Sequence, residues 1–478
     1  MNRQIVKLFG LILVLYALLF GFTSYWSVFD SSSLKANTAN RRPLLEEQRI
    51  KRGNILADDG RTVIAHSRPL GKGNNQIYVR HYPLGALFGN PIGYSFVDRG
   101  RVGFELSHND ELVGNKTEFL SVLDELQGHA QQGDNVQSAL NVNAQRAAVD
   151  GLAGRRGSVV AMDPTTGEIK AMVSIPEYDP NQVESSNAFR RLNTETSAPL
   201  LNRATQGGYP PGSTMKVVTA TAALDSGDLS TSSVLSGRSP IAIEGVPLAN
   251  SGGEQFGDID MTTALTNSVN TWWAQAGEKI GKDTMFKYMD RFGFNAKPRL
   301  DYPGFQLFAS GVYDGNKLLG PNDAIDIGRV AIGQERLRVT PLQMAEVAAA
   351  VANKGELMEP RLWSKVIDPD GRETKLDPAR QSNVMSEHTA SELNDMMQSV
   401  VNEGTGTAAA VSGIDVAGKT GTAEISPGVN DAWFIGFAPA NDPKIAISCI
   451  VEHTSGFGGP TCGPIFKAVA ESLLGSGA

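Results

Sequence analysis

The 478-residue sequence has few cysteines, no excess of basic residues and no internal repeat. Cysteine occurs only at Cys449 and Cys462, so a dense disulfide framework is excluded, and the two thiols are either bridged or separately buried. Lys and Arg total 43 against 51 Asp and Glu, which gives a formal net charge of -8. No basic stripe stands out from this acidic background, which excludes a nucleic-acid partner. The absence of a solenoid-type repeat excludes repeat architectures.

Histidine is also scarce, with six in the chain. His66, His81, His108 and His129 share no metal-ligand spacing, so surface or core histidines are the preferred interpretation and no metal site is predicted. The hydrophobic fraction of 41% and charged fraction of 20% are those of an ordinary globular protein with a sizeable core. The length allows two or three domains.

One long apolar run lies at the N-terminus. Arg3 and Lys7 precede Leu8–Val28, which has no charged residue and as a helix spans roughly 30 Å, the thickness of a bilayer core. No small-residue cleavage site follows, so we predict an uncleaved anchor over 8–28 rather than a signal peptide. The basic residues before it predict a cytoplasmic end over 1–7 and an extracytoplasmic remainder.

Residues 29–154 are predicted to form a small non-catalytic domain, here called the pedestal. It begins with a polar connector, and Arg52–Ala65 is predicted to be a hairpin because two β-branched runs flank the turn dipeptide Asp59-Gly60. Two helices are expected, over Thr117–Gln132 and Val142–Ala153.

Residues 155–478 are predicted to form the second domain. Gly157–Ser174 forms a hairpin, and the chain is then mostly helical to about residue 405, with one helix capped by Thr340, Pro341 and a Gln343 capping box. Another helix covers Glu387–Glu403. Three successive strands and a last helix follow, over Val416–Glu424, Ala432–Ala438, Lys444–His453 and Pro464–Leu474. The expected fold class is α/β (α+β), a five-stranded antiparallel sheet flanked by helices, with a helical lobe inserted.

The segment Gly207–Lys216, with sequence GGYPPGSTMK, carries the first candidate chemistry. Two prolines and a glycine end any earlier helix, so a helix is expected to begin at Ser213. Its hydroxyl then lies near unpaired backbone N–H groups that favour a developing negative charge. Lys216 lies one turn further on the same face, where a partly desolvated amine can act as general base. Ser-x-x-Lys alone also occurs by chance.

Two further short motifs are individually weak. Ser268-Val269-Asn270 lies in the helical segment, and Lys419-Thr-Gly-Thr422 lies on the first strand of the C-terminal meander. The second overlaps a competing pattern, because 413–420 fits the phosphate loop G-x-x-x-x-G-K-[ST]. That motif needs a helix directly after it, whereas Gly421 and Thr422 follow here, so a nucleotide site is disfavoured.

Ser-x-x-Lys, Ser-x-Asn and Lys-Thr-Gly in this order and spacing are together highly specific, and the chain resembles the penicillin-binding proteins over its whole length. The anchor, the Arg52-Gly-Asn-Ile55 hairpin, the Tyr209–Ser213 entry and the Ala432–Pro439 strand are similar to those of a class B member. No glycosyltransferase domain precedes the pedestal, which disfavours class A. The short pedestal is similar to that of actinobacterial penicillin-binding protein A.

The resemblance implies a serine D,D-transpeptidase that cross-links peptidoglycan stem peptides ending in D-Ala-D-Ala and is acylated by β-lactams. It makes Ser213 the nucleophile, Lys216 its base and Ser268 the proton relay, with the backbone N–H groups of Ser213 and Thr422 as oxyanion hole. Asn270 is expected to hold the substrate amide, and Lys419, Thr420 and Thr422 the terminal carboxylate. Gly421 is expected to leave room for the substrate backbone, and Lys419 to disfavour a second ammonium at Lys216. No cofactor or metal is implied.

Three alternatives and several partners stay open. A hydrolase, either a carboxypeptidase or a β-lactamase, is the nearest alternative. A β-lactamase is disfavoured because Val269 replaces the Asp of class A β-lactamases and no Glu-x-x-Leu-Asn segment is found, whereas a carboxypeptidase is to be distinguished by its product. A non-catalytic sensor or scaffold is disfavoured by the complete motif set. The implied setting is cell wall synthesis in growth, shape or division, beside a glycosyltransferase or proteins of the division or elongation machinery. The third stem-peptide residue and the acceptor are not predicted.

Overall fold

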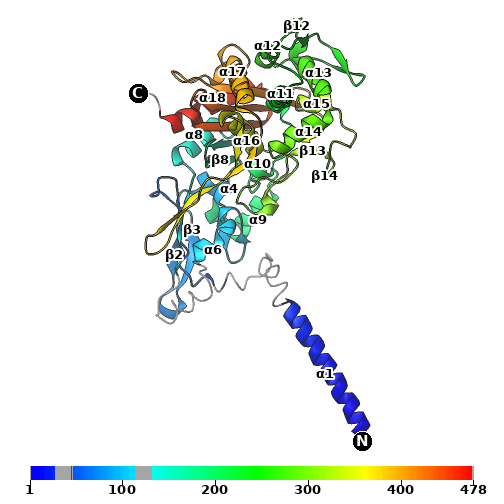
Figure 1. The fold of residues 1–478 in the computed structure, drawn as a ribbon. Coiled ribbons are helices and arrows are strands. Elements are labelled where there is room, and N and C mark those ends of the chain that lie inside the picture. Colours follow the sequence, from blue (N-terminus) through cyan, green and yellow to red (C-terminus); the bar gives the residue numbers. More distant parts are fainter. Residues whose placement is uncertain (1, 27–44, 46, 115–131, 476–478) are drawn as a thin grey trace.

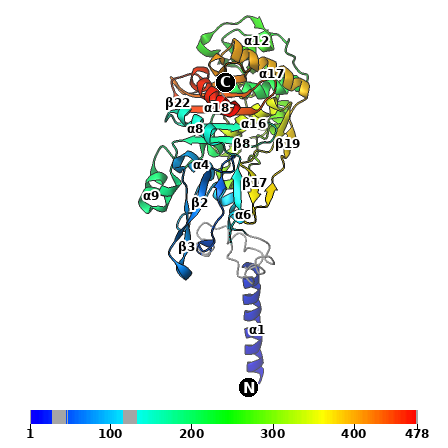
Figure 2. The ribbon, with the colours of Figure 1, turned by 90° about the vertical axis from the view of Figure 1, so that its left-hand side faces the viewer.

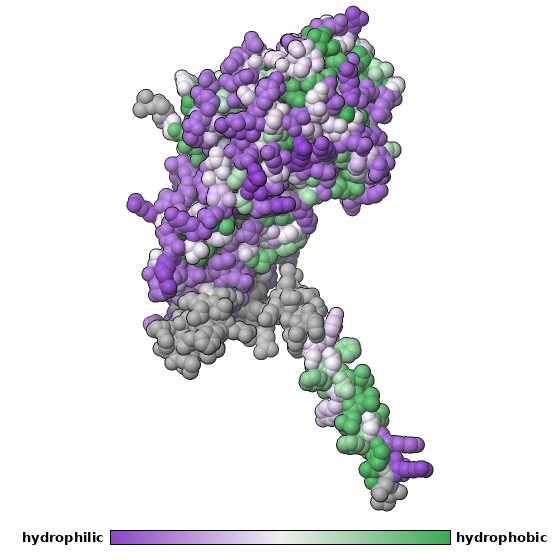
Figure 3. All heavy atoms as spheres, viewed as in Figure 1, coloured by the Kyte–Doolittle hydropathy of each residue, from purple (hydrophilic) through white to green (hydrophobic). Residues whose placement is uncertain are grey.

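The computed structural model describes residues 2–26, 45, 47–114 and 132–475. Helix α1 (Asn2–Ser24) carries the apolar run, and no side chain of its 22-residue segment Arg3–Ser24 is buried. Figure 3 shows this helix as a column of hydrophobic residues. At about 1.5 Å per residue the segment is long enough to cross a bilayer. The helix begins six residues before the predicted start at Leu8, and the predicted end, residues 27–28, lies outside the described residues.

The pedestal is built on a six-stranded sheet in the order β18-β17-β6-β1-β2-β3. The predicted hairpin is confirmed, since Ile55 of β1 pairs antiparallel with Ala65 of β2, and the Asp59 carboxylate accepts hydrogen bonds from the backbone N–H groups of Arg61 and Thr62. The bounds are β1 (Ile55–Leu56), β2 (Val63–Leu70), β3 (Ile77–His81) and β6 (Asn135–Ser138), with short helices α4 (Gly89–Ile92), α5 (Phe104–Ser107) and α6 (Asn109–Val113). The helix expected over 117–132 falls on residues 115–131, outside the described residues, except for Gln132.

Two strands of the pedestal sheet come from much later in the chain. Strand β17 (Trp363–Ile367) pairs antiparallel with β6, and β18 (Glu373–Lys375) pairs with β17. Figures 1 and 2 show these yellow strands beside the blue strands of the N-terminal part. The sheet therefore joins segments from both sides of residue 155, while the domain boundaries themselves stay a prediction.

The second sheet has five antiparallel strands in the order β20-β21-β22-β7-β8. Their bounds are β7 (Gly157–Met162), β8 (Ile169–Ile175), β20 (Ala417–Ser426), β21 (Val429–Ala438) and β22 (Ile445–Thr454). This confirms the predicted hairpin, the C-terminal meander and the number of strands. Strand β20 lies at one edge, so one side of its backbone stays open to a ligand.

Alternating residues of this sheet enter two different hydrophobic cores. Val159 and Phe434 belong to the core under α8 (Val142–Leu152) and α18 (Gly458–Leu474), while Val160 and Trp433 belong to the core on the opposite face, with α16 (Pro341–Ala352). Successive strand residues point to opposite faces, so the sheet is covered by helices on both sides. Cys449 and Cys462 lie in the first of these cores as free, buried thiols.

The chain between the two halves of this sheet forms the helical lobe with small hairpins inserted. Its helices include α9 (Ser186–Thr194), α10 (Arg203–Gln206), α11 (Lys216–Asp225), α12 (Met261–Thr266), α13 (Asn270–Ile280), α14 (Lys282–Arg291), α15 (Ile327–Ala331) and α17 (Glu387–Asn402). Short strands interrupt them, among them β10 (Ile241–Ile243), β11 (Val246–Leu248), β13 (Gly311–Asp314), β16 (Glu356–Met358) and β19 (Arg380–Asn383). The prediction of a mostly helical stretch missed these short pairs, because strands of three or four residues leave no periodicity.

Two predicted helix starts differ from the structure in detail. Thr340 caps α16 by accepting the Gln343 N–H at 3.1 Å, but the Gln343 side chain donates to Phe292 O instead of completing a capping box. Helix α18 begins at Gly458, six residues before the predicted Pro464, which lies inside the helix. A Cβ on Gly458 would lie 2.2 Å from Gly421 O, so this helix start needs glycine to pack against β20.

A buried carboxyl group on α16 makes the stability pH-dependent. Glu346 is 1% exposed, its Oε1 has no hydrogen-bond partner among the described residues, and burial raises its pKa to about 8. In the folded protein Glu346 therefore keeps its proton at pH values where the same carboxyl group in the unfolded chain has already lost it. Stability falls as pH rises from about 4.5 towards 8, by about 3 kcal/mol at pH 7.

Glu346→Gln should remove this dependence, because an amide does not ionise. Chemical denaturation of the full chain in micelles measures the free energy of unfolding. The variant should be more stable than wild type at pH 8, and its stability should change less between pH 5 and 8. Glu254→Gln, in an exposed loop, is the matched control and should leave the profile unchanged. Parallel pH profiles for Glu346→Gln and wild type would contradict the buried neutral carboxyl.

Candidate active site

Ser213 lies in a short 3-10 turn, η5 (Gly212–Met215), and the α-helix α11 begins only at Lys216. The helical structure predicted to begin at Ser213 therefore begins within one residue of it, but its first turn is a 3-10 turn, which is tighter than an α-helical turn. Three contacts fix this turn: Gly212 N donates to Gly333 O at 3.0 Å, Trp433 Nε1 donates to Pro210 O at 3.0 Å, and Thr214 Oγ1 donates to Pro211 O. Gly212 has a φ of +52°, a conformation that favours glycine.

Lys216 is the centre of the hydrogen-bond network. Its Nζ lies 2.9 Å from Ser213 Oγ, 2.7 Å from Ser268 O, 2.7 Å from Asn270 Oδ1 and 3.3 Å from Ser268 Oγ. A neutral amine has two N–H groups and one lone pair. The two acceptors at 2.7 Å, neither of which can donate, take the two N–H groups. The lone pair is then left for the Ser213 hydroxyl.

The electrostatics of the site favour that neutral amine. Lys216 is fully buried, and burial, together with the positive charge of Lys419, lowers its pKa well below the ordinary value. Burial also lowers the pKa of Lys419 to about 7. Two ammonium groups this close repel each other, so the site favours one neutral lysine and one that can carry the charge.

Ser268 connects the two lysines. Its Oγ lies 2.9 Å from Lys419 Nζ and 3.3 Å from Lys216 Nζ. It sits between α12 and α13 with a φ of +59°, a strained conformation for a serine. This bend turns both the carbonyl and the hydroxyl of Ser268 towards the lysines. Asn270 donates its Nδ2 to Ala249 O at 3.3 Å, which orients its Oδ1 towards Lys216.

The third motif lies on the edge strand β20. Lys419 points to Ser268, the Thr420 hydroxyl lies 2.6 Å from Thr405 Oγ1, and the Thr422 hydroxyl accepts the Gly458 N–H at 3.1 Å. A Cβ on Gly212 would lie 3.2 Å from Thr422 N, so the backbone of Thr422 directly adjoins the turn that carries Ser213. The structure thus brings Ser213, Lys216, Ser268, Asn270, Lys419 and Thr422 into one cluster. The Thr420 hydroxyl contacts Thr405 and also lies 3.5 Å from Lys419 Nζ, at the border of this cluster.

Gly421 is needed for a reason other than the predicted one. A Cβ at this position would lie 2.7 Å from Pro211 O, 2.9 Å from Thr214 Cγ2 and 3.0 Å from Trp433 Cβ. The missing side chain therefore lets β20 approach the turn that carries Ser213. The space that a Cβ on Gly421 would need is filled by Pro211, Thr214 and Trp433, not left open for a substrate backbone.

Gly421→Ala should lower the free energy of unfolding by about 2 kcal/mol, because a methyl group forced against backbone overpacks the core. Gly257→Ala is the matched control, since nothing lies within 4 Å of the Cβ it would gain. Denaturation of the purified full chain measures both. Equal stability of Gly421→Ala and wild type would show that β20 and the turn are not in close contact.

The phosphate-loop pattern is not realised. Gly413 lies in the turn between the bridge partners Val411 and Ile414, and Lys419 lies within β20, which continues to Ser426 as a strand. A phosphate loop requires a helix at that point. Among the described residues no group of three His, Cys, Asp or Glu side chains is arranged to hold a metal ion.

Some supporting contacts gave no recognisable signal in the sequence. Glu452 on β22 accepts hydrogen bonds from Tyr209 OH and Arg203 Nε, both at 2.7 Å, and pairs with Arg156 at 3.0 Å. Tyr209 directly precedes the Pro-Pro-Gly turn, so this buried carboxylate anchors the approach to Ser213 from more than 200 residues away. The contact of Thr405 with Thr420 likewise gave no signal in the sequence.

Comparisons with known proteins agree with this arrangement. Residues 157–471 match the family described as the penicillin binding protein transpeptidase domain, and residues 52–136 match the penicillin binding protein A dimerisation domain. The chain is 32% identical to the peptidoglycan D,D-transpeptidase PbpA of Mycolicibacterium smegmatis over the full length of both, and 30% identical to stage V sporulation protein D of Bacillus subtilis over 83% of this chain and 64% of that protein.

Solved structures give the same result. The ceftriaxone acyl-enzyme complex of penicillin-binding protein A from Mycobacterium tuberculosis superposes with a TM-score of 0.81 at 31% identity, covering 90% of this chain and all of that one. The D,D-transpeptidase domain of a peptidoglycan glycosyltransferase from Eggerthella lenta superposes with a TM-score of 0.77 at 32% identity, covering 89% of this chain and 98% of that one. The two domain matches, the full-length identity and the shared fold show that this chain belongs to the class B penicillin-binding proteins and is similar to penicillin-binding protein A of actinobacteria.

Proposed function

We propose that this protein is a membrane-anchored peptidoglycan D,D-transpeptidase that works through an acyl-enzyme on Ser213. The observation that carries the proposal is the position of Lys216 Nζ, 2.9 Å from Ser213 Oγ and held by two acceptors at 2.7 Å. This geometry prepares a lone pair to take the serine proton. The relatives named above include proteins called D,D-transpeptidases and acyl-enzyme complexes with β-lactams.

In the first step Ser213 Oγ attacks the carbonyl carbon of the penultimate D-Ala while its proton passes to Lys216. The oxyanion that forms is stabilised by the backbone N–H groups of Ser213 and Thr422, on the turn and the edge strand that adjoin at Gly212. Lys419 and the hydroxyls of Thr420 and Thr422 orient the terminal carboxylate, and Asn270 orients the substrate amide.

In the second step the C–N bond to the terminal D-Ala breaks. The proton on Lys216 reaches the leaving amine through Ser268, whose hydroxyl lies 3.3 Å from that lysine. An amine of a neighbouring stem peptide then attacks the ester, forms the new amide bond and returns a proton to Ser213 Oγ. A β-lactam enters at the first step, and its opened ring remains attached as the stable acyl group.

The location proposed for this chemistry is the outer side of the cell membrane. Helix α1 supplies the one candidate span among the residues that the structure describes, and Arg3 and Lys7 at its start favour a cytoplasmic N-terminus. In this orientation residues 29–478 lie outside the membrane.

A product assay separates transfer from hydrolysis. Offered a stem-peptide thioester and a D-amino acid, the full chain in micelles should yield the aminolysis product, seen as a new amide by mass spectrometry. Hydrolysis without any aminolysis product would instead indicate a carboxypeptidase, and no turnover at all would favour a non-catalytic scaffold.

The partners proposed for this activity are a glycosyltransferase and proteins of the division or elongation machinery. Septal placement of a fluorescently tagged copy during growth would assign the protein to division, whereas polar placement would assign it to elongation.

A further inference from the structure

Thr405, which lies outside the three sequence motifs, adjoins the active site just after the end of α17. Its backbone N–H donates to Thr266 O, at the end of α12, at 3.3 Å, and its hydroxyl lies 2.6 Å from the Thr420 hydroxyl on β20. A Cβ on Gly459, at the start of α18, would lie 2.2 Å from Thr405 O. Thr405 therefore lies between α12 and β20, and α12 and α18 fix its backbone.

Lys419 is fully buried and uses its N–H groups within the protein. An ammonium group has three N–H donors, and Lys419 Nζ lies 2.9 Å from Ser268 Oγ, 3.1 Å from Thr420 O and 3.5 Å from Thr420 Oγ1. These acceptors match the donors in number. Lys419 can therefore attract a substrate carboxylate by its charge, but a direct hydrogen bond has to come from a group nearer the surface.

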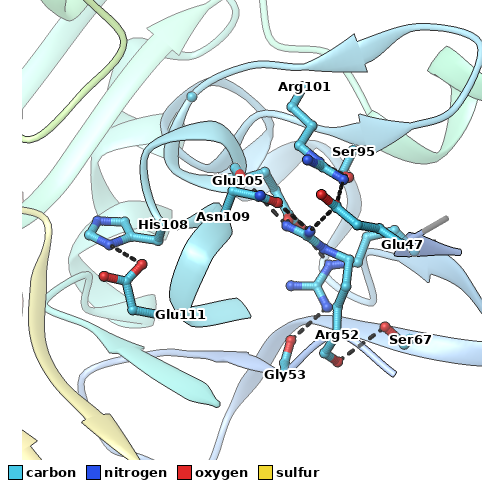
Figure 4. Close-up of polar contacts among 12 residues, drawn as sticks. Glu47, Arg52, Gly53, Ser67, Ser95, Arg101, Glu105, His108, Asn109 and Glu111 are labelled. Atoms are coloured by element: carbon cyan, nitrogen blue, oxygen red, sulfur yellow. Dashed lines mark hydrogen bonds and ion pairs between the residues drawn. The ribbon is translucent and has the colours of Figure 1, made fainter. Parts of the chain in front are cut away.

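A buried charge cluster in the pedestal gives a contrast. Arg52 donates to Glu105 at 2.8 Å, and Glu47 pairs with Arg101. Figure 4 shows Glu47, Arg52 and Glu105 joined in one network. These arginines have acidic partners within the protein, whereas Lys419 pairs with no carboxylate among the described residues. The positive charge of Lys419 is therefore left for a ligand.

The contacts of Thr420 decide the direction of the hydrogen bond between the two threonines. A hydroxyl has one proton and two lone pairs. Thr420 is only 6% exposed, and a buried O–H group needs an acceptor. Lys419 can only donate while it is charged, so Thr405 Oγ1 is the one acceptor left for the Thr420 proton among the residues that the structure describes. Thr420 therefore donates to Thr405.

Thr405 then keeps its own proton at the surface. The residue is exposed, and within the described part of the chain its hydroxyl contacts only Thr420. Successive hydrogen bonds polarise one another, so the charge of Lys419 makes the Thr405 O–H group a stronger donor. The result is a chain of contacts from Lys419 through Thr420 to Thr405 that ends at the solvent.

A second outward proton lies on the same strand, at Thr422. Its Oγ1 accepts the Gly458 N–H at 3.1 Å, which leaves its own O–H group to donate. Thr420 and Thr422 are two residues apart on β20, so their side chains lie on the same face of the strand. Helix α18 begins at Gly458, and the positive end of its dipole adds to the attraction for an anion.

We propose that the Thr405 hydroxyl donates a hydrogen bond to the carboxylate of the ligand, either the C-terminal carboxylate of a stem peptide or the carboxylate of a β-lactam. Thr420 takes part by polarising Thr405, and Thr422 supplies a second hydrogen bond. Thr405 is thus a specificity residue that selects for an anionic group, while the bond-making step stays with Ser213 and Lys216. This inference rests on the proposed function for the identity of the ligand.

Thr405→Val tests this hydrogen bond, because valine keeps the shape of threonine and lacks its hydroxyl. Stopped-flow acylation of the full chain in micelles separates the dissociation constant of the first, reversible penicillin complex from the acylation rate within it. Thr405→Val should raise that dissociation constant about ten-fold, as expected for a lost hydrogen bond to a charged group, and leave the rate unchanged. Thr405→Ser should bind like wild type. Thr407→Val, at an exposed position two residues away, is the control.

Penicillin methyl ester separates carboxylate recognition from a structural role of Thr405. The ester has no charge at this position, so the loss in Thr405→Val should shrink to about three-fold or less, as for a hydrogen bond to a neutral group. Equal losses for the acid and the ester would overturn the proposal, because they would show a general change in the site. An unchanged dissociation constant for the acid would overturn it as well.

Equilibrium binding to Ser213→Ala tests the inference without the chemistry. Ligand-observed NMR compares a stem-peptide analogue ending in D-Ala-D-Ala with its C-terminal amide. A preference for the acid that Thr405→Val reduces in this background supports the inference even if wild type forms no adduct, a result that would overturn the proposed function alone. No preference for the acid, or a preference that Thr405→Val leaves intact, overturns the inference.

Discussion

Lys216→Met should slow the acylation of Ser213 by penicillin by about 10²- to 10⁴-fold, the usual contribution of a general base. Methionine is unbranched and fills most of the buried space of the lysine side chain, but its thioether is too weak a base to accept the serine proton. Stopped-flow measurement of adduct formation gives the rate. Lys279→Met, at an exposed position on α13, is the control and should react like wild type.

The pH profile of the same reaction gives independent evidence for the two lysine roles. The pKa of Lys216 lies well below its ordinary value, so the base is lost only when pH falls far enough to protonate it. Lys419, with a pKa of about 7, loses its charge as pH rises and with it the attraction for the substrate carboxylate. The acylation rate of the free enzyme should therefore decline on both sides of a maximum. A rate that rises steadily to pH 10 would show that Lys216 titrates as an ordinary lysine.

Ser213→Ala should abolish covalent labelling by a fluorescent penicillin, with a loss of more than about 10⁴-fold. The hydroxyl is the atom that forms the bond, and the other groups of the cluster can bind the drug but cannot hold it covalently. The variant should fold normally, because Ser213 is only partly buried and its turn is fixed by Gly212, Pro210 and Thr214. Ser230→Ala, in an exposed loop, is the control. Labelling of Ser213→Ala at the wild-type rate would place the nucleophile elsewhere.

Local patterns predicted much of the fold. The Asp59-Gly60 hairpin, the Thr340 cap and the five strands of the central sheet follow from turn residues, capping residues and alternation, all of which act within a few neighbours in sequence. The addition of β17 and β18 to the pedestal sheet was not predicted, because pairing between Val366 and Val136 depends on the whole fold. The start of α18 at Gly458 was missed for a similar reason, since its glycines serve contacts with β20 rather than helix formation.

In the candidate site, too, contacts between neighbours in sequence were predicted and contacts between distant segments were not. Ser213 and Lys216 are three residues apart, and one helical turn suffices to bring their side chains together. The motif order placed Ser268, Asn270 and Lys419 in the same cluster, but it did not show that Asn270 Oδ1 contacts Lys216. Nor did it show why residue 421 is glycine. Both depend on atoms of segments 50 to 210 residues away.

The most direct test of the account is the location of the acyl group in the wild-type protein. After brief exposure of the full chain to benzylpenicillin, peptide mapping by mass spectrometry should find the mass of the opened drug on one peptide, at Ser213. Drug mass on Ser268 or on another residue, or no added mass at all, would contradict a mechanism in which Lys216 activates Ser213.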